Sequence, residues 1–330
     1  MLKYILKRLA LSVFILLGVS LIIYVLIRCM PVSFIDDKIA QMNQGGATIP
    51  QETIDSMKAM YGLEDDSFVG ILKGYANWLG ALCQFDFGTS FKYGAPVIKV
   101  IRDNMGVSFA VAFIATVFEF LIAIPLGITA ATHQYSVTDY VVTVIVMIGI
   151  SLPSFFFGQL LKDLFAIKLG WFPPSGLIDA TVDHSFFGKI VDYAKHLFIP
   201  ILTVVILSIG GRMRMTRTNM LEVLNSDYIR TARAKGLKEK TVIYKHAFRN
   251  TLIPLVTSLA GLLPSLFSGA IITEQVFDLP GIGNKAFQAM IAADIPFIMG
   301  YNMFLALLSV IGVLLADLMY AVVDPRVKLQ

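Results

Sequence analysis

The sequence has few charged residues and almost no cysteine or histidine. Of its 330 residues, 15% are Asp, Glu, Lys or Arg, two are Cys and four are His. A soluble domain carries about a quarter charged residues, and a disulfide-stapled secreted module needs several cysteines. No Cys-x-x-Cys pair and no His/Cys cluster occurs, so the sequence lacks the ligands of a structural zinc or iron–sulfur site. These absences exclude an ordinary soluble protein, a disulfide-rich module and such metal centres.

Motifs for nucleotide binding and for proteolysis are also absent. The only Gly-Lys dipeptide, Gly188-Lys189, has Asp183 where a phosphate-binding G-x-x-x-x-G-K loop requires glycine. An intramembrane protease would need a Ser/His pair, two Asp residues or H-E-x-x-H within its apolar segments, and none appears. The chain therefore cannot bind ATP by that loop, and we do not expect an enzyme.

The sequence contains many long hydrophobic runs, and 56% of its residues are hydrophobic. The hydrocarbon core of a bilayer is about 30 Å thick, and a helix of about 20 mostly uncharged residues crosses it. Six segments are expected to span the membrane: 9–27, 107–131, 140–161, 197–211, 251–273 and 298–323. The fourth has only 15 residues, so its helix must tilt little or extend past its apolar limits. The sequence predicts an all-α polytopic membrane protein with six transmembrane helices.

The first hydrophobic run is expected to remain as a membrane anchor. It follows Lys3, Lys7 and Arg8, as a signal peptide would, but it is longer than a signal's apolar core of about 7–15 residues. It also ends at Arg28 without a small-residue cleavage site. We expect four regions, namely a stub with the first span, an extracytoplasmic loop, a five-helix core and a tail, at 1–29, 30–106, 107–323 and 324–330.

Basic residues are unequally divided between the two sides of this predicted bundle. The short segments on the side of both termini contain fifteen Lys or Arg residues, and those on the opposite side contain five. Because Lys and Arg concentrate in cytoplasmic loops, both termini and the tail are expected in the cytoplasm. Ten of the fifteen lie in 212–250, beside only three acidic residues. This segment is the one large cytoplasmic feature that the sequence predicts.

The extracytoplasmic loop contains two predicted amphipathic helices. Pro50 in a first turn begins one at about 50–61, which Gly62 ends. The other follows from apolar residues at helical spacing: Phe68, Ile71, Leu72, Tyr75, Trp78, Leu79 and Leu82. Two interpretations of this stripe are open, a cap packed on the membrane face and a docking site for an external solute-binding partner. Cys29 and Cys83 lie on this oxidising side, either as separate thiols or as a disulfide.

Two short helices joined at a glycine are predicted within the basic segment. Asn225-Ser226-Asp227 supplies a capping side chain followed by an acid, so a helix is expected over 228–235. Gly236 can adopt the left-handed conformation that ends a helix. A second helix is expected at about 238–250, with four apolar residues on one side: Val242, Ile243, Ala247 and Phe248.

No nucleic-acid partner is expected for this basic segment, because the sequence has no nucleic-acid recognition module. Three roles remain open: an orientation signal, attraction to anionic lipid headgroups and docking of another protein. The first two need only positive charge. Neither explains the small residues Ala232, Ala234 and Gly236 among the charges, whereas small side chains would let a partner's surface approach closely. Docking is therefore the more specific hypothesis.

The same segment carries a family resemblance. The run DYIRTARAKGL at 227–237, followed by HAFRNTLIP at 246–254, resembles the coupling-helix signature of ABC importer permeases, and more narrowly the B-type subunit of the dipeptide/oligopeptide/nickel class. The resemblance covers the whole chain, with further segments that fit that subunit: YILKRL at 4–9, FDFGTS at 85–90, FDLPGIG at 277–283 and DPR at 324–326. Arg230 departs from the general importer pattern, which has Glu there, and so do Thr231 and His246.

This resemblance implies a type I ABC importer permease fold in a bacterial cytoplasmic membrane, passing di- or oligopeptides by alternating access. It implies three kinds of partner: a second homologous permease subunit, two cytoplasmic ATPases that hold the ATP and Mg, and an extracytoplasmic solute-binding protein. No cofactor would bind this chain. The coupling segment, residues 226–250, would transmit force from the ATPases through Tyr228, Arg230, Ala232, Arg233, Ala234, Gly236, Leu237 and His246. Nickel or glutathione import within the same class is an alternative, and a proton-coupled secondary transporter is another.

Several polar or small residues within the spans are candidates for a substrate path or a subunit interface. Glu119 lies in mid-span, where an acid is a functional candidate, although a proton relay would need a second acid or His at similar depth and no other span has one. An interhelical hydrogen bond is the other interpretation of Glu119, and Gln159 has the same two interpretations. Gly261, Ser265 and Gly269 recur at four-residue spacing, which lets helices pack closely within this chain or against a partner.

Overall fold

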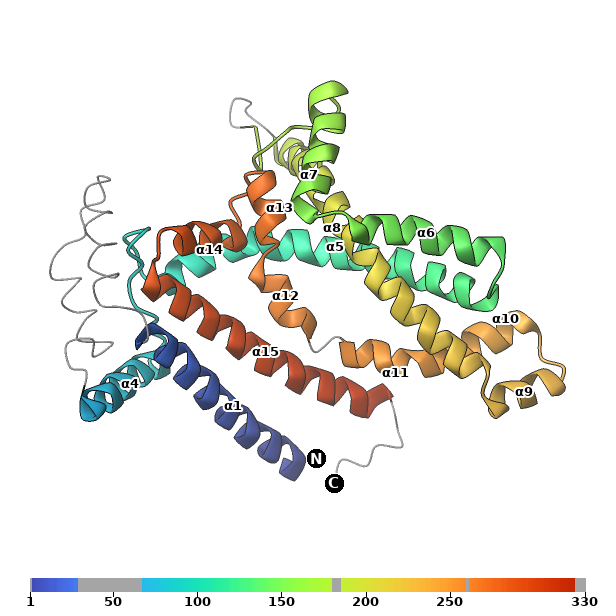
Figure 1. The fold of residues 1–330 in the computed structure, drawn as a ribbon, viewed down its shortest axis with the longest axis horizontal. Coiled ribbons are helices and arrows are strands. Elements are labelled where there is room, and N and C mark those ends of the chain that lie inside the picture. Colours follow the sequence, from blue (N-terminus) through green and yellow to red (C-terminus); the bar gives the residue numbers. More distant parts are fainter. Residues whose placement is uncertain (1, 29–66, 180–184, 259–260, 324–330) are drawn as a thin grey trace. The chain divides into compact units, whose positions relative to one another are not determined.

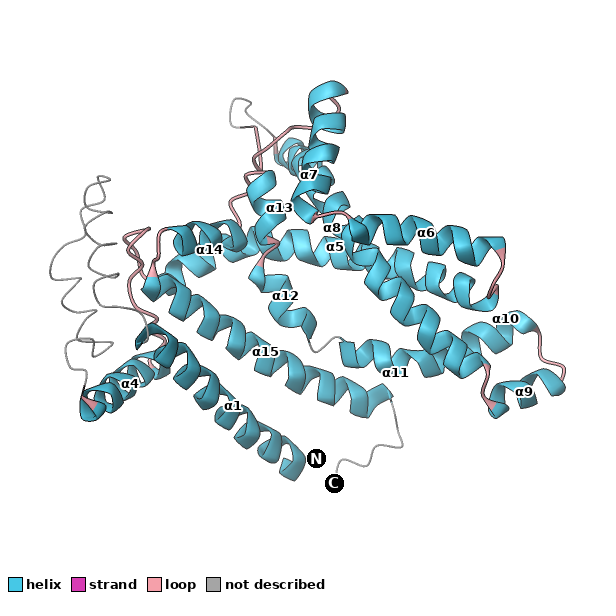
Figure 2. Ribbon diagram, viewed as in Figure 1, coloured by secondary structure: helices cyan, strands magenta, loops and turns pink. Residues whose placement is uncertain are grey.

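The computed structural model describes residues 2–28, 67–179, 185–258 and 261–323. In these ranges the chain is helical, and no β-strand forms apart from an isolated bridge between Thr89 and Pro96 (Figure 2). The all-α prediction is confirmed. Figure 1 labels the elements in part. Two of them, η1 and η2, are π-helices, whose turns are wider than those of an α-helix. The elements in chain order are α1 (Leu2–Arg28), α4 (Phe68–Cys83), α5 (Val97–Thr132), α6 (Val137–Ser151), α7 (Ser154–Lys162), η1 (Asp163–Lys168), α8 (Phe186–Leu224), α9 (Asp227–Ala234), α10 (Glu239–Thr241), η2 (Val242–Phe248), α11 (Arg249–Ser258), α12 (Leu262–Ser268), α13 (Ile271–Val276), α14 (Ile282–Ile291) and α15 (Ile295–Val323).

Four of the described helices, α1, α5, α8 and α15, are long and apolar enough to cross a membrane. A fifth crossing results if α6 and the α7–η1 helix, which are bent by 98° relative to each other, count as one span. The fourth predicted span lies within α8, whose 39 residues extend well past the apolar limits of 197–211, as expected.

The third predicted span, 140–161, is not one straight helix, and the prediction of a continuous span is wrong. The residue before a proline avoids the helical conformation because the proline ring collides with its backbone. Leu152 is accordingly extended, with φ −88° and ψ 136°, and Pro153 stands at the start of α7. This single proline produces the 98° bend.

The fifth predicted span, 251–273, is also divided. It begins in α11 and continues, beyond residues 259–260 that lie outside the described ranges, into α12 and α13. Gly269 has φ 72° and separates α12 from α13, because a left-handed residue cannot continue a right-handed helix.

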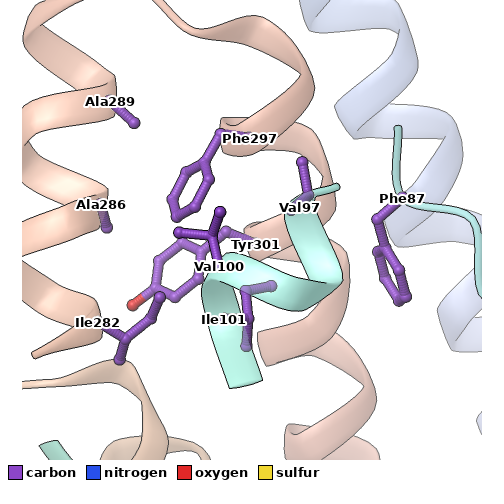
Figure 3. Packing of buried hydrophobic residues seen from close by; sticks show 9 residues of the cluster. All are labelled: Phe87, Val97, Val100, Ile101, Ile282, Ala286, Ala289, Phe297 and Tyr301. Carbon is purple, nitrogen blue, oxygen red and sulfur yellow. The ribbon is translucent and has the colours of Figure 1, made fainter. Parts of the chain in front are cut away.

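The described chain forms two compact units, one from 1–106 with 281–311 and the other from 107–280 with 312–329. In the first unit, the start of α5 packs against α14 and α15 (Figure 3). Its buried apolar core consists of Phe87, Val97, Val100, Ile101, Ile282, Ala286, Ala289, Phe297 and Tyr301. A Cβ atom on Gly300 would lie 2.9 Å from side-chain atoms of Phe87 and Val97, so this close packing requires glycine.

The second predicted amphipathic helix of the outer loop forms as α4 and packs on α1. Trp78 is 1% exposed and stacks on Tyr24, and the Tyr75 hydroxyl lies 2.8 Å from the Ser20 hydroxyl. Part of the stripe is therefore buried against α1, whereas Phe68 and Leu72 remain exposed. The predicted helix at 50–61 and Cys29 lie outside the described residues, and Cys83 is an exposed free thiol.

In the second unit, α8 is in close contact with both α5 and α6. A Cβ atom on Gly127 of α5 would lie 2.7 Å from the Cβ of Thr216. On the other side, a Cβ atom on Gly210 would collide with Ile150 of α6. These glycines bring α8 near enough to hold the polar groups described below.

Candidate functional site

The coupling segment begins where the sequence predicts. Ser226 is the N-cap of α9 in an extended conformation, with φ −74° and ψ 152°, and Asp227 is the acid in the first turn. The Ser226 hydroxyl donates to the carbonyl oxygen of Val223 at 2.6 Å instead of capping α9. The turn between α8 and α9 is thereby tied to the end of α8.

Gly236 ends the first helix in the left-handed conformation that the sequence predicts. Its φ is 71°, and its N–H donates to the carbonyl oxygen of Arg233 at 2.9 Å. Apart from Gly236 itself and its two chain neighbours, no residue of the described chain lies within 4 Å of a Cβ placed on Gly236. Glycine is therefore required here by the backbone conformation and not by crowding within this chain.

The second predicted helix forms as α10, η2 and the first residues of α11. Val242 and Ala247 are fully buried, and Ile243 and Phe248 pack against the same cluster, which confirms the predicted apolar face. The wider turns of η2 lie within this stretch, and such turns occur often at functional sites.

A buried cluster fixes the coupling segment to two of the long helices. Ile229 of α9 packs with Met220 of α8, and the cluster also contains Ile128 and Ala131 of α5. Ile229 and Met220 have no exposed surface. These contacts hold α9 firmly against α5 and α8, because close-packed side chains resist deformation.

Ala232 lies in this buried cluster, and its expected place on the partner-facing surface is wrong. It is 7% exposed. Residues three apart share one face of a helix, so Ala232 must point the same way as Ile229. Its small side chain permits close packing within this chain.

An ion pair joins α9 to α10 across the glycine turn. The Arg233 guanidinium donates to both carboxylate oxygens of Glu239, at 2.7 and 3.2 Å. This hydrogen bonding lowers the pKa of Glu239 below its ordinary value and raises that of Arg233. The side chains are 44% and 55% exposed, so the pair links the two helices but adds little stability.

The outward side of the coupling segment combines aromatic, apolar and basic groups. Tyr228, Leu237 and Tyr244 are large exposed side chains. Arg230 is 71% exposed and lies 3.6 Å from Asp227, within the same helix. The other coupling residues predicted from the sequence differ in exposure, Ala234 being exposed and His246 half-buried.

Glu119 of α5 forms a buried ion pair with a residue that the sequence analysis missed. Arg212 Nε donates to Glu119 Oε1 at 3.0 Å, and Arg212 Nη1 donates to the Ser258 hydroxyl at 2.8 Å (α5, α8 and α11 in Figure 1). The Arg212 guanidinium also lies 4.5 Å from the centre of the Phe120 ring. Three helices thus meet at one satisfied polar group, as the hydrogen-bond interpretation of Glu119 expects.

A second ion pair missed from the sequence joins α6 to α8. Arg217 donates to both carboxylate oxygens of Asp139, at 2.9 and 2.7 Å. The backbone N–H of Tyr135 donates to the same carboxylate at 3.1 Å. Both Arg212 and Arg217 were placed in a cytoplasmic segment by sequence, because the fourth span was expected to end at residue 211.

The remaining substrate-path candidates are not brought together. Gln159 is exposed on α7. Gly261 and Gly269 are the N-cap and C-cap residues that flank α12. Ser265 is exposed between them, and its hydroxyl donates to the carbonyl oxygen of Leu262. The expected stripe at four-residue spacing is wrong for Gly269, because the helix ends there.

The FDFGTS stretch in the first unit forms a turn held by a buried acid. Asp294 accepts hydrogen bonds from the Ser90 hydroxyl and from the backbone N–H groups of Lys92 and Phe297. Burial raises the pKa of Asp294 above its ordinary value despite these bonds. Burial, with the nearby Asp294 charge, raises the pKa of Tyr93 to about 12, and the Tyr93 hydroxyl donates to the carbonyl oxygen of Lys285 at 2.7 Å. This stretch therefore has a structural role in anchoring the loop.

Comparisons with known proteins agree on one family. The model of the family described as "Binding-protein-dependent transport system inner membrane component" matches residues 123–329. The chain is 36% identical to the oligopeptide transport system permease protein AppB of Bacillus subtilis, over 99% of this chain and 100% of that protein. It is 33% identical to the dipeptide transport system permease protein DppB of Alkalihalophilus pseudofirmus, again over 99% and 100%. Among solved structures, an inward-facing MetNI methionine ABC transporter aligns with a TM-score of 0.52 at 18% identity, covering 69% of this chain and 97% of that chain, which shows a common fold.

Proposed function

Because the chain belongs to the family of binding-protein-dependent transport system inner membrane components, we propose that it passes di- or oligopeptides across a bacterial cytoplasmic membrane as the permease subunit of an ATP-driven importer. The family makes the chain a multi-pass membrane permease and not an enzyme. The peptide substrate is supported by the relatives at 36% and 33% identity, which are named as oligopeptide and dipeptide permeases.

The coupling segment is the part of the chain that receives force from the ATPases. The observation that carries this proposal is the division of α9 into two sides. Ile229 and Ala232 are buried against α5 and α8, whereas Tyr228 and Arg230 are exposed. A partner that grips the exposed side moves the long helices with it, which is the rigid-body switching that alternating access requires.

The proposed assembly contains this chain, a second homologous permease subunit, two cytoplasmic ATPases and an extracytoplasmic solute-binding protein. ATP and Mg are held by the ATPases, because this chain has no phosphate-binding loop. Both termini lie in the cytoplasm, an orientation supported by the ten basic residues in 212–250.

Reconstitution in vesicles tests this function. The complete assembly is expected to accumulate a labelled peptide only with ATP and the binding protein, and an uncoupler of the proton gradient should leave uptake unchanged. The purified chain alone should accumulate nothing. Accumulation by the chain alone, or collapse of uptake with the uncoupler, would instead indicate a secondary transporter. Competition by nickel or glutathione, and not by peptides, would overturn the substrate class while leaving the permease function intact.

Separate variants test the coupling segment. Tyr228→Ala and Leu237→Ala remove exposed side chains and should reduce peptide-stimulated ATP hydrolysis by the assembly. Lys189→Gln, an exposed change at the other end of α8, is the control. If both alanine variants hydrolyse ATP and transport as the control does, this segment is not where force enters.

A further inference from the structure

We propose that the groove between α6 and α8 around Arg214 binds the phosphate headgroup of an anionic phospholipid. That the lipid belongs to the cytoplasmic leaflet rests on the proposed orientation of the chain. The site lies apart from the coupling segment and from the Glu119–Arg212 pair.

The groove has the size and the lining of a headgroup site. Its volume is about 410 Å³. Side chains at helical spacing on α8 form one wall, and residues 139–147 of α6 together with Tyr135 form the other (α6 and α8 in Figure 1). The polar lining residues are Tyr135, Asp139, Tyr140, Thr143, Arg214, Arg217 and Thr218.

The charge of the groove comes from Arg214. The positive charge of Arg217 is neutralised by Asp139, which accepts from it through both carboxylate oxygens. Arg214 forms no ion pair with any carboxylate of the described residues, and its Nη2 instead lies 3.1 Å from the sulfur of Met147. A guanidinium without a carboxylate partner, in a groove with hydroxyl donors, suits a phosphate group.

The surroundings of the groove favour a lipid over a soluble phosphate compound. The same stretch of α6 that lines the groove also carries exposed apolar side chains at helical spacing: Val137, Val141, Val144, Ile145 and Ile148. Tyr135 and Tyr140, also exposed, are amphipathic residues of the kind that lie at the headgroup level of a membrane. A phospholipid satisfies both parts, since its chains lie along the apolar face while its phosphate contacts Arg214. Basic pockets between transmembrane helices on the cytoplasmic side are where anionic headgroups bind.

Lipid retention by the full chain tests the site. The chain is reconstituted in nanodiscs containing equal amounts of phosphatidylglycerol and phosphatidylcholine, released into detergent, and weighed by native mass spectrometry. We expect retained phosphatidylglycerol to be enriched about fivefold over phosphatidylcholine, as about 1 kcal/mol for one basic residue near a lipid phosphate implies. Arg214→Gln should abolish the enrichment and Arg214→Lys should retain part of it. Lys189→Gln, which removes one exposed charge elsewhere on α8, should leave it unchanged.

Several outcomes would overturn the site. Equal enrichment in wild type and Arg214→Gln, or equal losses in Arg214→Gln and Lys189→Gln, would show that this groove does not select the lipid. Displacement of the lipid by added inorganic phosphate would identify a site for a free anion. A disulfide between Thr218→Cys and the second permease subunit in the intact assembly would show that protein, and not lipid, fills the groove. Arg214→Lys keeps the test informative if Arg214→Gln fails to fold. Loss of peptide transport by the assembly would count against the proposed function, and it would say nothing about lipid retention.

Discussion

At the scale of single residues, glycine can be required at Gly236 for two reasons, a left-handed backbone or close packing against another surface. Its φ of 71° is strained for a residue with a Cβ atom, yet nothing in the described chain would contact that atom. A substitution at Gly236 can therefore affect transport in two ways, by straining the backbone or by disturbing the contact with a partner that covers this residue.

Two substitutions separate these contributions. Gly236→Val should cost about 1–2 kcal/mol of left-handed strain and lower peptide uptake, whereas Gly236→Asn should retain more uptake because Asn tolerates this conformation. Uptake is measured in cells and corrected for the amount of permease in the membrane, which neither change should reduce. Equal and normal uptake with both variants would show that neither the turn nor its surface matters for coupling.

The Glu119–Arg212 pair makes a prediction about buried charge. The two side chains are 11% and 18% exposed, so removing one leaves the other unpaired in the membrane-spanning part. Such a loss costs about 3 kcal/mol or more. Glu119→Gln and Arg212→Gln should each lower the unfolding temperature of the purified permease in detergent, and the double variant should recover most of that loss.

Uptake by the same variants assigns the role of the pair. If the double variant is stable and transports normally, Glu119 has only a packing role. If it is stable and does not transport, Glu119 or Arg212 contacts the substrate path. Destabilisation that is simply additive in the double variant would contradict the ion pair itself.

At the scale of elements, the Arg233–Glu239 pair predicts a specific pH dependence. Because the pKa of Glu239 is lowered from its ordinary value of 4.5, the pair's contribution is fully present above pH 4.5 and is lost as pH falls through the lowered value. This contribution is about 0.2–1 kcal/mol for an exposed pair. The difference in stability between wild type and Glu239→Gln should therefore be constant between about pH 6 and 8 and should shrink as the pH falls through the lowered pKa of Glu239.

Charge reversal supplies the control for this pair. Arg233→Glu alone places two acids across the Gly236 turn and should reduce coupling, and the exchange Arg233→Glu with Glu239→Arg should restore it. ATP hydrolysis stimulated by the binding protein is the measurement. Failure of the exchange to restore hydrolysis would show that Arg233 contacts a partner directly.

Much of the element order follows from local signals in the sequence. The start of α9, the turn at Gly236 and the apolar face of Val242 and Ala247 depend on capping, a left-handed glycine and helical spacing, which act over a few residues. The family signature also lies in such local patterns.

Some features were not predicted from the sequence, either because a local signal was overlooked or because they depend on contacts between residues far apart in the chain. Pro153 indicates a bend, but the length of the apolar run favoured the prediction of one continuous span. The ion pairs of Arg212 and Arg217 could not be predicted, because their acidic partners lie 93 and 78 residues away in the chain. Only the packing of α8 against α5 and α6 brings these charges together.

At the scale of the whole molecule, the proposed orientation can be tested with the chain's own cysteine. Cys83 is an exposed thiol in the loop expected outside the cytoplasm. With Cys29 replaced by Ser, a membrane-impermeant maleimide added to intact cells should label Cys83. With both cysteines replaced, Lys240→Cys in α10 should be labelled only after the membrane is opened. The reverse pattern would place both termini outside and remove the basic segment from reach of any ATPase.

The two-sided character of α9 also has a consequence for engineering. Ile229 and Ala232 hold the helix to its own chain, whereas Tyr228, Leu237 and Tyr244 are exposed in the described part of the chain. The second set can therefore be exchanged for the corresponding side chains of a relative while the scaffold stays intact. A permease altered in this way should couple to the ATPases of that relative and not to its own ATPases. The peptides that it transports should stay the same.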